Sequence, residues 1–487
     1  MDHKKLNRRD FFRKVALPAA ATAATAGFLP ATGCGKSGFT KNPDIPNIIF
    51  ITADNLGWYD LSCYGNKNVK TPGTDRIAAG GVRFTSAFVV SSSCAPSRAS
   101  FLTGQYPHTH GVTALTHLKK TKALSPFAAT LPKLLRDAGY NTAMQGKWHE
   151  SPYLPTSWYG FNERLSGMMT KDWHIRDIGR AVDFIKRNKS NRFYLQMNFI
   201  NNHRDPYGEY YYDKDFPVDP TRIKVPPYMA MPDWPEIRED LARYYSQSLR
   251  MEKLIGDLLN ELEKLGLTDN TLVMFTSDNG PHYPGMISSL YDRGVGVPLI
   301  VRWPGKVKPG TSITHMINSI DIMPTLLEAA GVAVHPGVQG KSFLPMLKNP
   351  KAPPLHEQIF MEIDEHVYHI PTRVVRTKEW KYIRNYSDTA LGLDQNNHME
   401  WAHRMCELPN HPWKRPRQRE ELYNVGKDPN EQINLAANPN YAGRLEELRK
   451  MLDDHMKKTG DLYLGREFAR EFNAENYKPI PPGTKYW

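Results

Sequence analysis

The chain has 487 residues, enough for about three average domains or for one large domain with a smaller partner. Charged residues make up 23% and aromatic residues 11%, which excludes a wholly disordered chain and a coiled coil. The formal net charge is +12, but no run of five or six basic residues concentrates it. The charge therefore favours diffuse attraction of anionic substrates, and we expect no nucleic-acid partner.

Residues 1–34 are predicted to be an export signal outside the fold. A basic segment precedes an Ala-rich stretch from Val15 to Pro30, which is short for a membrane span. Within the basic segment, Arg8-Arg9 and the residues around it resemble the twin-arginine signal of bacteria, with an ordinary basic signal as the alternative. The segment ends at Cys34 like a lipoprotein cleavage site. We therefore expect a bacterial protein of the periplasm or cell surface, either attached to the membrane through lipid on Cys34 or free.

The next part of the chain alternates strand and helix patterns. After a polar tether at 35–46, the apolar run from Asn47 to Ala53 is too short for a helix and predicts a strand buried on both faces. Similar runs, with helical patterns between them, occupy 193–200, 271–276 and 297–301, and the helices are predicted at 131–138 and 241–265. This alternation predicts an α/β fold: a mostly parallel sheet covered by helices on both faces, with active groups at the carboxyl ends of the strands.

From about residue 331 the pattern changes to short strands joined by polar turns. Strands are predicted at 358–362, 372–376 and 381–384, followed by a helix at 441–457. They indicate a small antiparallel sheet packed by a helix, whereas 391–419, rich in His, Trp, Arg and Pro, is predicted to be a loop. The expected organisation is an export signal (1–34), a tether (35–46), a catalytic domain (47–330) and a smaller C-terminal domain (331–487).

The most specific motif lies between Cys94 and Gly104. It consists of Cys-x-Pro-Ser-Arg, two further residues, two apolar residues, Thr and Gly. Pro96 predicts the start of a helix, so Cys94 is expected at a helix N-terminus, where an anion is favoured and Arg98 can reach the same charge. The motif resembles the signature of the sulfatase family and matches it at every defined position.

The resemblance has three implications. It implies an alkaline-phosphatase-like fold and the hydrolysis of sulfate from a sulfated saccharide. It implies that a maturation enzyme oxidises Cys94 to formylglycine. It also implies that the hydrated aldehyde attacks with one hydroxyl and expels sulfate with the other, which splits one difficult step into two.

Two pairs of oxygen-bearing residues, together with Cys94, are the expected metal site. Asp54-Asn55 follows the predicted strand 47–53, and Asp278-Asn279 follows the strand at 271–276, so both pairs should lie at strand carboxyl ends beside Cys94. Oxygen ligands suit Ca²⁺, with Mg²⁺ as the alternative. The sulfatase family usually has two aspartates at the first pair. Asn55 removes one negative charge, which should weaken the site but leave an amide oxygen as ligand.

The remaining catalytic candidates are basic residues. Residues 139–149 resemble the second sulfatase signature, which implies that Lys147 holds a sulfate oxygen and that His149 takes the diol proton during elimination. His203 follows the predicted strand at 193–200, where the family places a histidine that contacts sulfate. The family commonly has a further lysine after Asp-Asn-Gly, which is absent here, and His282 or Arg293 are the candidates to replace it.

Within the family, the order of motifs is closest to that of the heparan N-sulfatases (N-sulfoglucosamine sulfohydrolases). N-sulfoglucosamine from heparan or heparin is therefore the first substrate hypothesis, although an arginine that those enzymes have near Ile287 is absent. Glu365 and His366, in the C-terminal domain, are candidate sugar contacts. The segments that carry this resemblance are 91–100, 202–204, 275–291 and 421–436.

Three alternatives stay open. The first is a carbohydrate O-sulfatase, for example one that acts on glucosamine 6-O-sulfate. The second is a phosphonate or phosphate-ester hydrolase, because the charge and geometry of those groups differ little from those of sulfate. The third is a lipoprotein that binds sulfated glycan without catalysis, which Asn55 and the missing lysine favour and the complete Cys94 motif disfavours.

Overall fold

The computed structural model describes residues 44–117, 121–166, 175–205, 208–389, 399–408 and 416–470. The predicted export signal and Cys34 lie outside these ranges. The chain from Lys41 onward forms one compact unit. Within the described ranges, no helix combines the length and the apolar character needed to cross a membrane.

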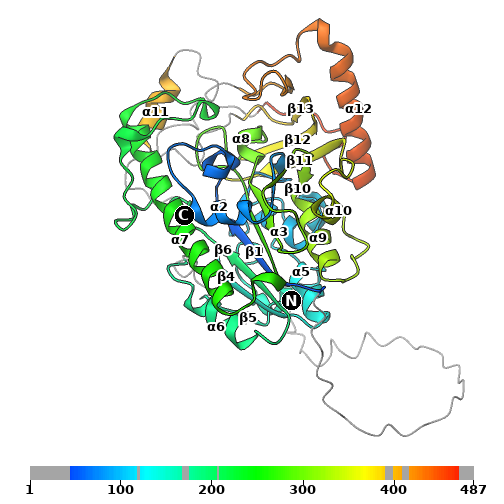
Figure 1. Ribbon diagram of the computed structural model, residues 1–487. Coiled ribbons are helices and arrows are strands. Elements are labelled where there is room, and N and C mark those ends of the chain that lie inside the picture. Colours follow the sequence, from blue (N-terminus) through cyan, green and yellow to red (C-terminus); the bar gives the residue numbers. More distant parts are fainter. Residues whose placement is uncertain are drawn as a thin grey trace, which may run out of the picture. The chain divides into compact units, whose positions relative to one another are not determined.

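An eight-stranded sheet forms the centre of this unit, in the order β5-β4-β6-β1-β7-β8-β2-β9 (Figure 1). The strands are β1 (Asn47–Ala53), β2 (Val82–Phe84), β4 (Asn141–Gly146), β5 (Glu163–Arg164), β6 (Phe193–Asn198), β7 (Thr271–Ser277), β8 (Leu299–Arg302) and β9 (Thr311–Ile313). Strand β8 runs antiparallel to both of its neighbours, and the other pairs in this sheet are parallel. The predicted mostly parallel sheet is confirmed.

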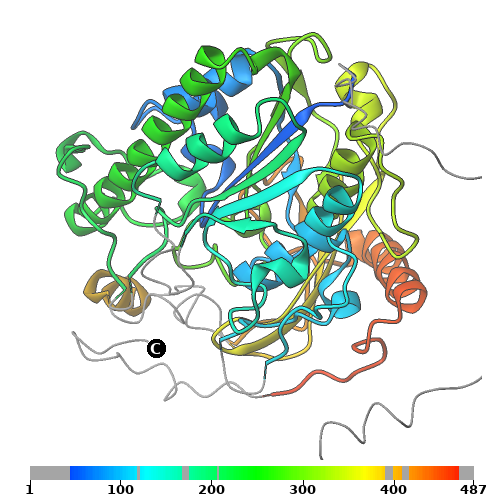
Figure 2. The same ribbon diagram turned by 90° about the horizontal axis from the view of Figure 1, so that it is seen from below.

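Helices cover both faces of the sheet (Figure 2). Successive side chains of β1 point to opposite faces, so Ile48 and Phe50 belong to one apolar core and Ile49 and Ile51 to the other. The first core includes α3 (Cys94–Thr103), α5 (Leu131–Asp137) and α9 (Ile322–Ala329), and the second includes α2 (Pro72–Ala79), α6 (Gly179–Arg187) and α7 (Pro235–Lys264). Burial on both faces explains the uninterrupted apolar run of β1.

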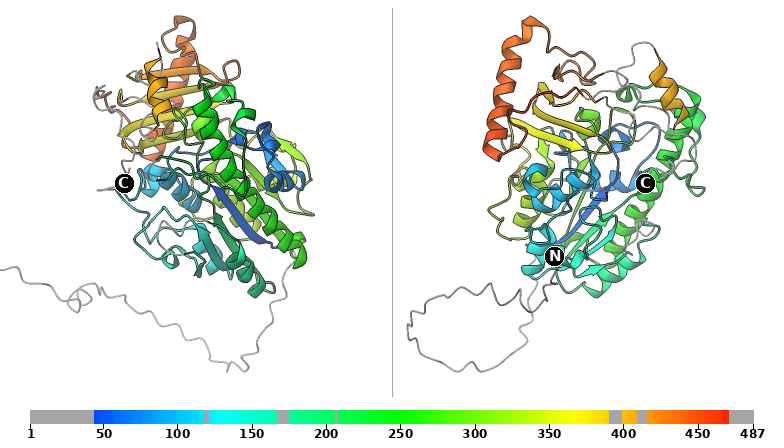
Figure 3. Two further views of the ribbon diagram at one scale, coloured as in Figure 1. Left: turned by 90° about the vertical axis from the view of Figure 1, so that its left-hand side faces the viewer. Right: turned by 180° about the vertical axis from the view of Figure 1, so that it is seen from behind.

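A second, antiparallel sheet follows in the C-terminal part of the chain. Its strands are β11 (Gln358–Glu365), β12 (His369–Thr377), β13 (Trp380–Asn385) and β14 (Glu420–Asn424), paired in that order. Helix α12 (Ala442–Thr459) packs against this sheet (Figure 3) through Leu445, Leu448, Leu452 and Met456. The predicted sheet and helix are confirmed, and β14 is an additional strand. The division into two domains at residue 330 stays a prediction.

The prediction of a loop at 391–419 is wrong within its described part. Helix α11 (Glu400–Glu407) occupies this stretch. Trp401, Ala402 and Met405 lie on one side of the helix and are buried in the core that contains α7. The polar and basic composition of the segment hides this short apolar face, because only three apolar positions are needed to dock two helical turns.

Candidate active site

The two predicted metal-binding pairs leave the central sheet side by side. Strands β1 and β7 are parallel neighbours, and Ala53 pairs with Ser277 in their register. Asp54 and Asp278 are the next residues of the two strands, and both are completely buried. The sheet therefore brings together two segments that lie more than two hundred residues apart in the chain.

The same edge of the sheet carries the predicted basic residues. Gly146 at the end of β4 pairs with Asn198 at the end of β6. Lys147 follows Gly146 directly, and His203 lies in the loop after β6. Asn198 connects the ends of β4 and β6, because its side chain donates a hydrogen bond to the carbonyl oxygen of Lys147 (2.7 Å).

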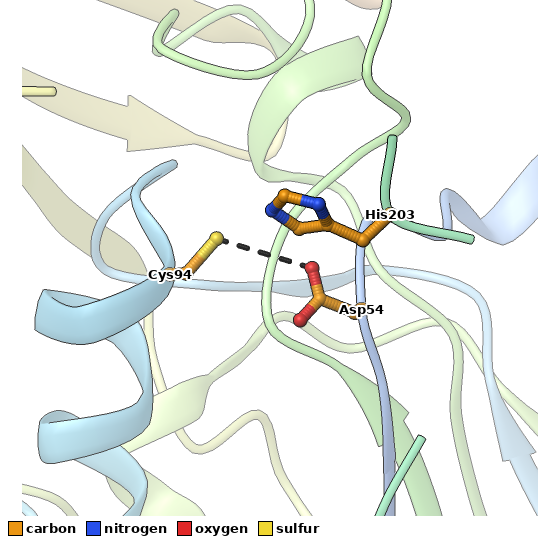
Figure 4. Close-up of side chains that lie close together, drawn as sticks. All are labelled: Asp54, Cys94 and His203. Carbon is orange, nitrogen blue, oxygen red and sulfur yellow. Dashed lines mark hydrogen bonds between the residues drawn. The ribbon is translucent and has the colours of Figure 1, made fainter. Parts of the chain in front are cut away.

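Cys94 faces these residues from the N-terminus of α3. The helix begins at Cys94 itself, two residues before Pro96. The thiol points toward the carboxylate of Asp54, and the imidazole of His203 lies close to both groups (Figure 4). Sγ lies 3.9 Å from Oδ1 of Asp54, 4.0 Å from Oδ1 of Asn55 and 3.8 Å from Oδ1 of Asn279. Three oxygens thus converge on the predicted nucleophile.

The thiol of Cys94 is protonated in this environment. Burial raises its pKa, and Asp54 and Asp278 add to the increase, whereas Lys147 and Arg98 only partly oppose it. The reactive form of a cysteine is the thiolate. A buried neutral thiol is a poor nucleophile, so the helix N-terminus by itself does not activate the unmodified residue.

Two buried cations neutralise the two carboxylates. Arg98 donates from Nε to Oδ2 of Asp278 (2.7 Å) and from a terminal nitrogen to Oδ2 of Asp54 (3.1 Å). Nζ of Lys147 lies 2.5 Å from Oδ2 of Asp54. Burial opposes the charge of Asp54, but Lys147 and Arg98 outweigh it and lower the pKa. For Asp278 burial prevails over Arg98, and the pKa is raised.

The donor set fits a hard divalent cation. Oδ1 of Asp54, Asn55 and Asn279 all surround the same point near Sγ of Cys94. The backbone of Asn55 is left-handed (φ 55°), a conformation in which asparagine is enriched among non-glycine residues. Nδ2 of Asn279 donates to Oδ1 of Asn55 (2.9 Å), which links the two loops. Carboxylate and amide oxygens are typical Ca²⁺ and Mg²⁺ ligands, and here the sulfur of Cys94 and the imidazole of His203 lie beside them.

The two predicted catalytic histidines, His149 and His203, are held in fixed orientations. Nε2 of His149 lies 2.9 Å from Nδ1 of His117, and the two rings are stacked. Burial and the nearby charge of Lys147 hold the pKa of His149 well below its usual range, which favours the neutral ring. Nδ1 of His203 donates to the carbonyl oxygen of Arg204 (2.5 Å), which orients its ring.

His282 and His366 extend this group of imidazoles. The His282 ring packs edge-to-face against His203, with centroids 5.8 Å apart. Neither ring nitrogen of His282 has a hydrogen-bond partner among the described residues, and burial keeps its pKa well below the usual range. His366 follows β11, and its Nδ1 lies 2.9 Å from Oγ of Ser93, the residue before Cys94. Of the two predicted sugar contacts, His366 therefore reaches the residue next to the nucleophile.

Arg293 and Glu365 are placed differently. Nε of Arg293 donates to the carbonyl oxygen of Gly285 (2.9 Å), and its guanidinium packs on the ring of Tyr291. Glu365, half-buried at the end of β11, pairs through its backbone with His369. The contacts described for these two residues do not join them to Cys94, so their predicted roles stay predictions.

The sequence analysis did not identify two side chains of this cluster. His117 contacts His149, and Ser93 contacts His366. His117 lies outside the motifs, and Ser93 directly precedes the Cys94 motif without a role assigned to it. Both contacts join separate segments of the chain, so only the tertiary structure reveals them.

Comparisons with known proteins agree with this geometry. The sequence model of the family described as Sulfatase matches residues 46–332, and the model described as N-sulphoglucosamine sulphohydrolase, C-terminal, matches residues 288–398. An ulvan-active sulfatase of Formosa agariphila is 31% identical over 435 residues, which cover 86% of this chain and 81% of the relative. Human N-sulphoglucosamine sulphohydrolase is 28% identical, with 85% and 90% covered. The structure of BT4656 in complex with its substrate D-glucosamine-2-N,6-O-disulfate has a similar fold, with a TM-score of 0.66 at 23% identity, over 86% of this chain and 99% of that chain.

Proposed function

The chain belongs to the sulfatase family, whose members hydrolyse sulfate from sulfated saccharides, and we propose that its substrate is N-sulfoglucosamine from heparan or heparin. The match of residues 288–398 to the C-terminal part of the N-sulphoglucosamine sulphohydrolases supports this choice. That segment includes His366, which reaches the residue next to Cys94. We further propose that the enzyme is exported to the periplasm or cell surface.

The observation that carries the proposed mechanism is a buried cysteine at the N-terminus of α3, surrounded by side-chain oxygens. Because the thiol is a poor nucleophile, we assign Cys94 to conversion into formylglycine by a maturation enzyme. A bound Ca²⁺ or Mg²⁺ would be held by Asp54, Asn55, Asp278 and Asn279. The cation would supply positive charge that polarises the sulfate group. Lys147 and Arg98, both fully buried, hold sulfate oxygens and also lower the pKa of Asp54.

Proton transfers are assigned to the oriented histidines. His149, neutral and fixed by His117, takes the proton from the residue-94 hydroxyl when sulfate leaves. His203, which lies close to the thiol and to Asp54, gives a proton to the departing amine. His282 packs against His203, whereas Arg293 contacts Tyr291, so His282 takes the place of the missing lysine.

The substrate assignment is tested by comparing two sulfated sugars. We expect kcat/KM for N-sulfoglucosamine to exceed that for glucosamine 6-O-sulfate by about tenfold or more, because a site that hydrogen-bonds the substrate nitrogen discriminates against an analogue without that contact. Ion chromatography measures the released sulfate. Glucosamine 6-phosphate is the third substrate, and its released phosphate is measured under the same conditions.

Faster release from glucosamine 6-O-sulfate would replace this assignment by a carbohydrate O-sulfatase. That second candidate is supported by the ulvan-active relative, which has the higher identity of the two named relatives. Faster release of phosphate would instead identify a phosphate-ester hydrolase.

The metal assignment predicts that chelation abolishes activity and that Asn55→Asp tightens metal binding. An added carboxylate beside Asp54 attracts the cation directly, so we expect the Kd for Ca²⁺ to fall by about tenfold or more. Calorimetric titration of the apo-protein measures the Kd without turnover. Asn440→Asp, at an exposed position, is the matched control. An unchanged or weaker affinity in Asn55→Asp would show that Asn55 is not a ligand.

A further inference from the structure

A second cavity, with a volume of about 190 Å³, lies apart from the residues around Cys94. Its walls include Trp58, Tyr59, Tyr228, Arg293 and Asn430. It is large enough for one sugar ring, since it has about six times the ~30 Å³ that a water molecule occupies in the liquid. None of the residues that line it in the described structure belongs to the Cys94 cluster.

Several residues that line the cavity belong to segments that leave the sheet at the same edge as the active-site residues. Trp58 and Tyr59 lie in the loop that begins with Asp54, and Arg293 follows Asn279 in the chain, on helix α8 (Asp292–Val295). Ser86, another residue that lines the cavity, lies just after β2. Strands β2 and β7 both run antiparallel to β8, which lies between them, so their carboxyl ends share one edge. Two strand spacings amount to ~10 Å, a distance that an oligosaccharide spans.

Aromatic faces line the mouth of the cavity. The rings of Tyr59 and Tyr228 lie 4.8 Å apart at an angle of 32°. Tyr59 is 43% exposed, and the hydroxyl of Tyr228 donates to Asp60, which fixes its ring. Flat aromatic faces with a polar tip suit the apolar face of a sugar ring and its hydroxyl groups.

The wall of the cavity holds one cation without a carboxylate partner in the described structure. Among the lining residues, Arg376 forms a salt bridge with Asp292, and Glu431 pairs with Lys381, a buried residue that does not line the cavity. The guanidinium of Arg293 donates to two backbone carbonyl oxygens, at 2.9 and 3.4 Å, and pairs with no carboxylate among the described residues. Arg293 is therefore the lining cation that can bind an anion.

We propose that this cavity binds a second sugar residue of a sulfated saccharide. Its ring face stacks on Tyr59, and its sulfate or carboxylate group binds Arg293. The inference rests on the proposed function for the substrate class and extends it, because the enzyme would then prefer oligosaccharides to monosaccharides.

The test measures binding without turnover, in the full-length Cys94→Ala protein. The probes are a heparin-derived tetrasaccharide, an ulvan-derived tetrasaccharide and N-sulfoglucosamine, each titrated calorimetrically. We expect at least one tetrasaccharide to bind more tightly than the monosaccharide. Adding Arg293→Gln should weaken the tetrasaccharide by about tenfold or more, the effect of losing a charge-assisted hydrogen bond, and Tyr59→Ala should weaken it as well. The affinity for the monosaccharide should not change.

Matched controls are Arg444→Gln, at a partly exposed position on α12, and Tyr153→Ala, at an exposed position, and these should bind like the parent. The proposal is overturned if no tetrasaccharide binds more tightly than the monosaccharide, if Arg293→Gln leaves tetrasaccharide affinity unchanged, or if it weakens both ligands equally. If the active enzyme fails to hydrolyse N-sulfoglucosamine while tetrasaccharide binding still depends on Arg293, the proposed substrate is refuted. That result would not refute the proposed role of the cavity.

Discussion

Replacement of Cys94 by alanine is expected to abolish sulfate release, with kcat lower by about 10⁴-fold or more, the scale of losing a covalent nucleophile. In enzyme produced together with a maturation enzyme, peptide mass spectrometry should show the aldehyde or its hydrate at residue 94 instead of the thiol. The physical reason is that burial keeps the unmodified thiol protonated, so activity requires a different chemical form of this residue.

Cys63→Ala is the matched control for this experiment. Cys63 is a free, half-buried cysteine whose pKa is raised to about 12, chiefly by burial. The variant should retain activity and should still carry the modification at residue 94. Fully active enzyme with an unmodified thiol at Cys94 would overturn the mechanism, because the neutral thiol would then be the nucleophile.

His149→Ala and His203→Ala are expected to stop the reaction at different steps. Elimination of sulfate requires that the residue-94 hydroxyl lose a proton, whereas the departing amine must gain one. His149→Ala should therefore release sugar once and retain the sulfate on the protein, while His203→Ala should slow the first release of sugar. Each loss should be about 10² to 10⁴-fold, the usual contribution of a positioned acid or base.

A single-turnover experiment separates the two roles, since it measures released sugar and protein-bound sulfate in the same sample. His335→Ala, at an exposed position, is the control and should behave like the parent. If His149→Ala shows neither a burst of sugar nor retained sulfate, His149 acts before or during the attack. The division of labour between the two histidines would then be wrong.

The sequence by itself determined the features that depend on neighbouring residues in the chain. The apolar run at 47–53 became β1, and the run at 271–276 became β7, because a strand buried on both faces must be apolar throughout. The motif that begins at Cys94 became α3 and identified the family. Helix α11 escaped prediction, because its few apolar contacts are made with a distant part of the core.

Only the tertiary structure decided which charges and rings meet. Lys147 reaches Asp54 because β6 lies between β4 and β1 in the sheet, an order that no local pattern encodes. The sequence left His282 and Arg293 as equal candidates for one role. The fold instead packs His282 against His203 and places Arg293 in the wall of another cavity. Burial and the summed charge of surrounding groups set the ionisation of Cys94 and Asp54, and these depend on contacts between segments far apart in the chain.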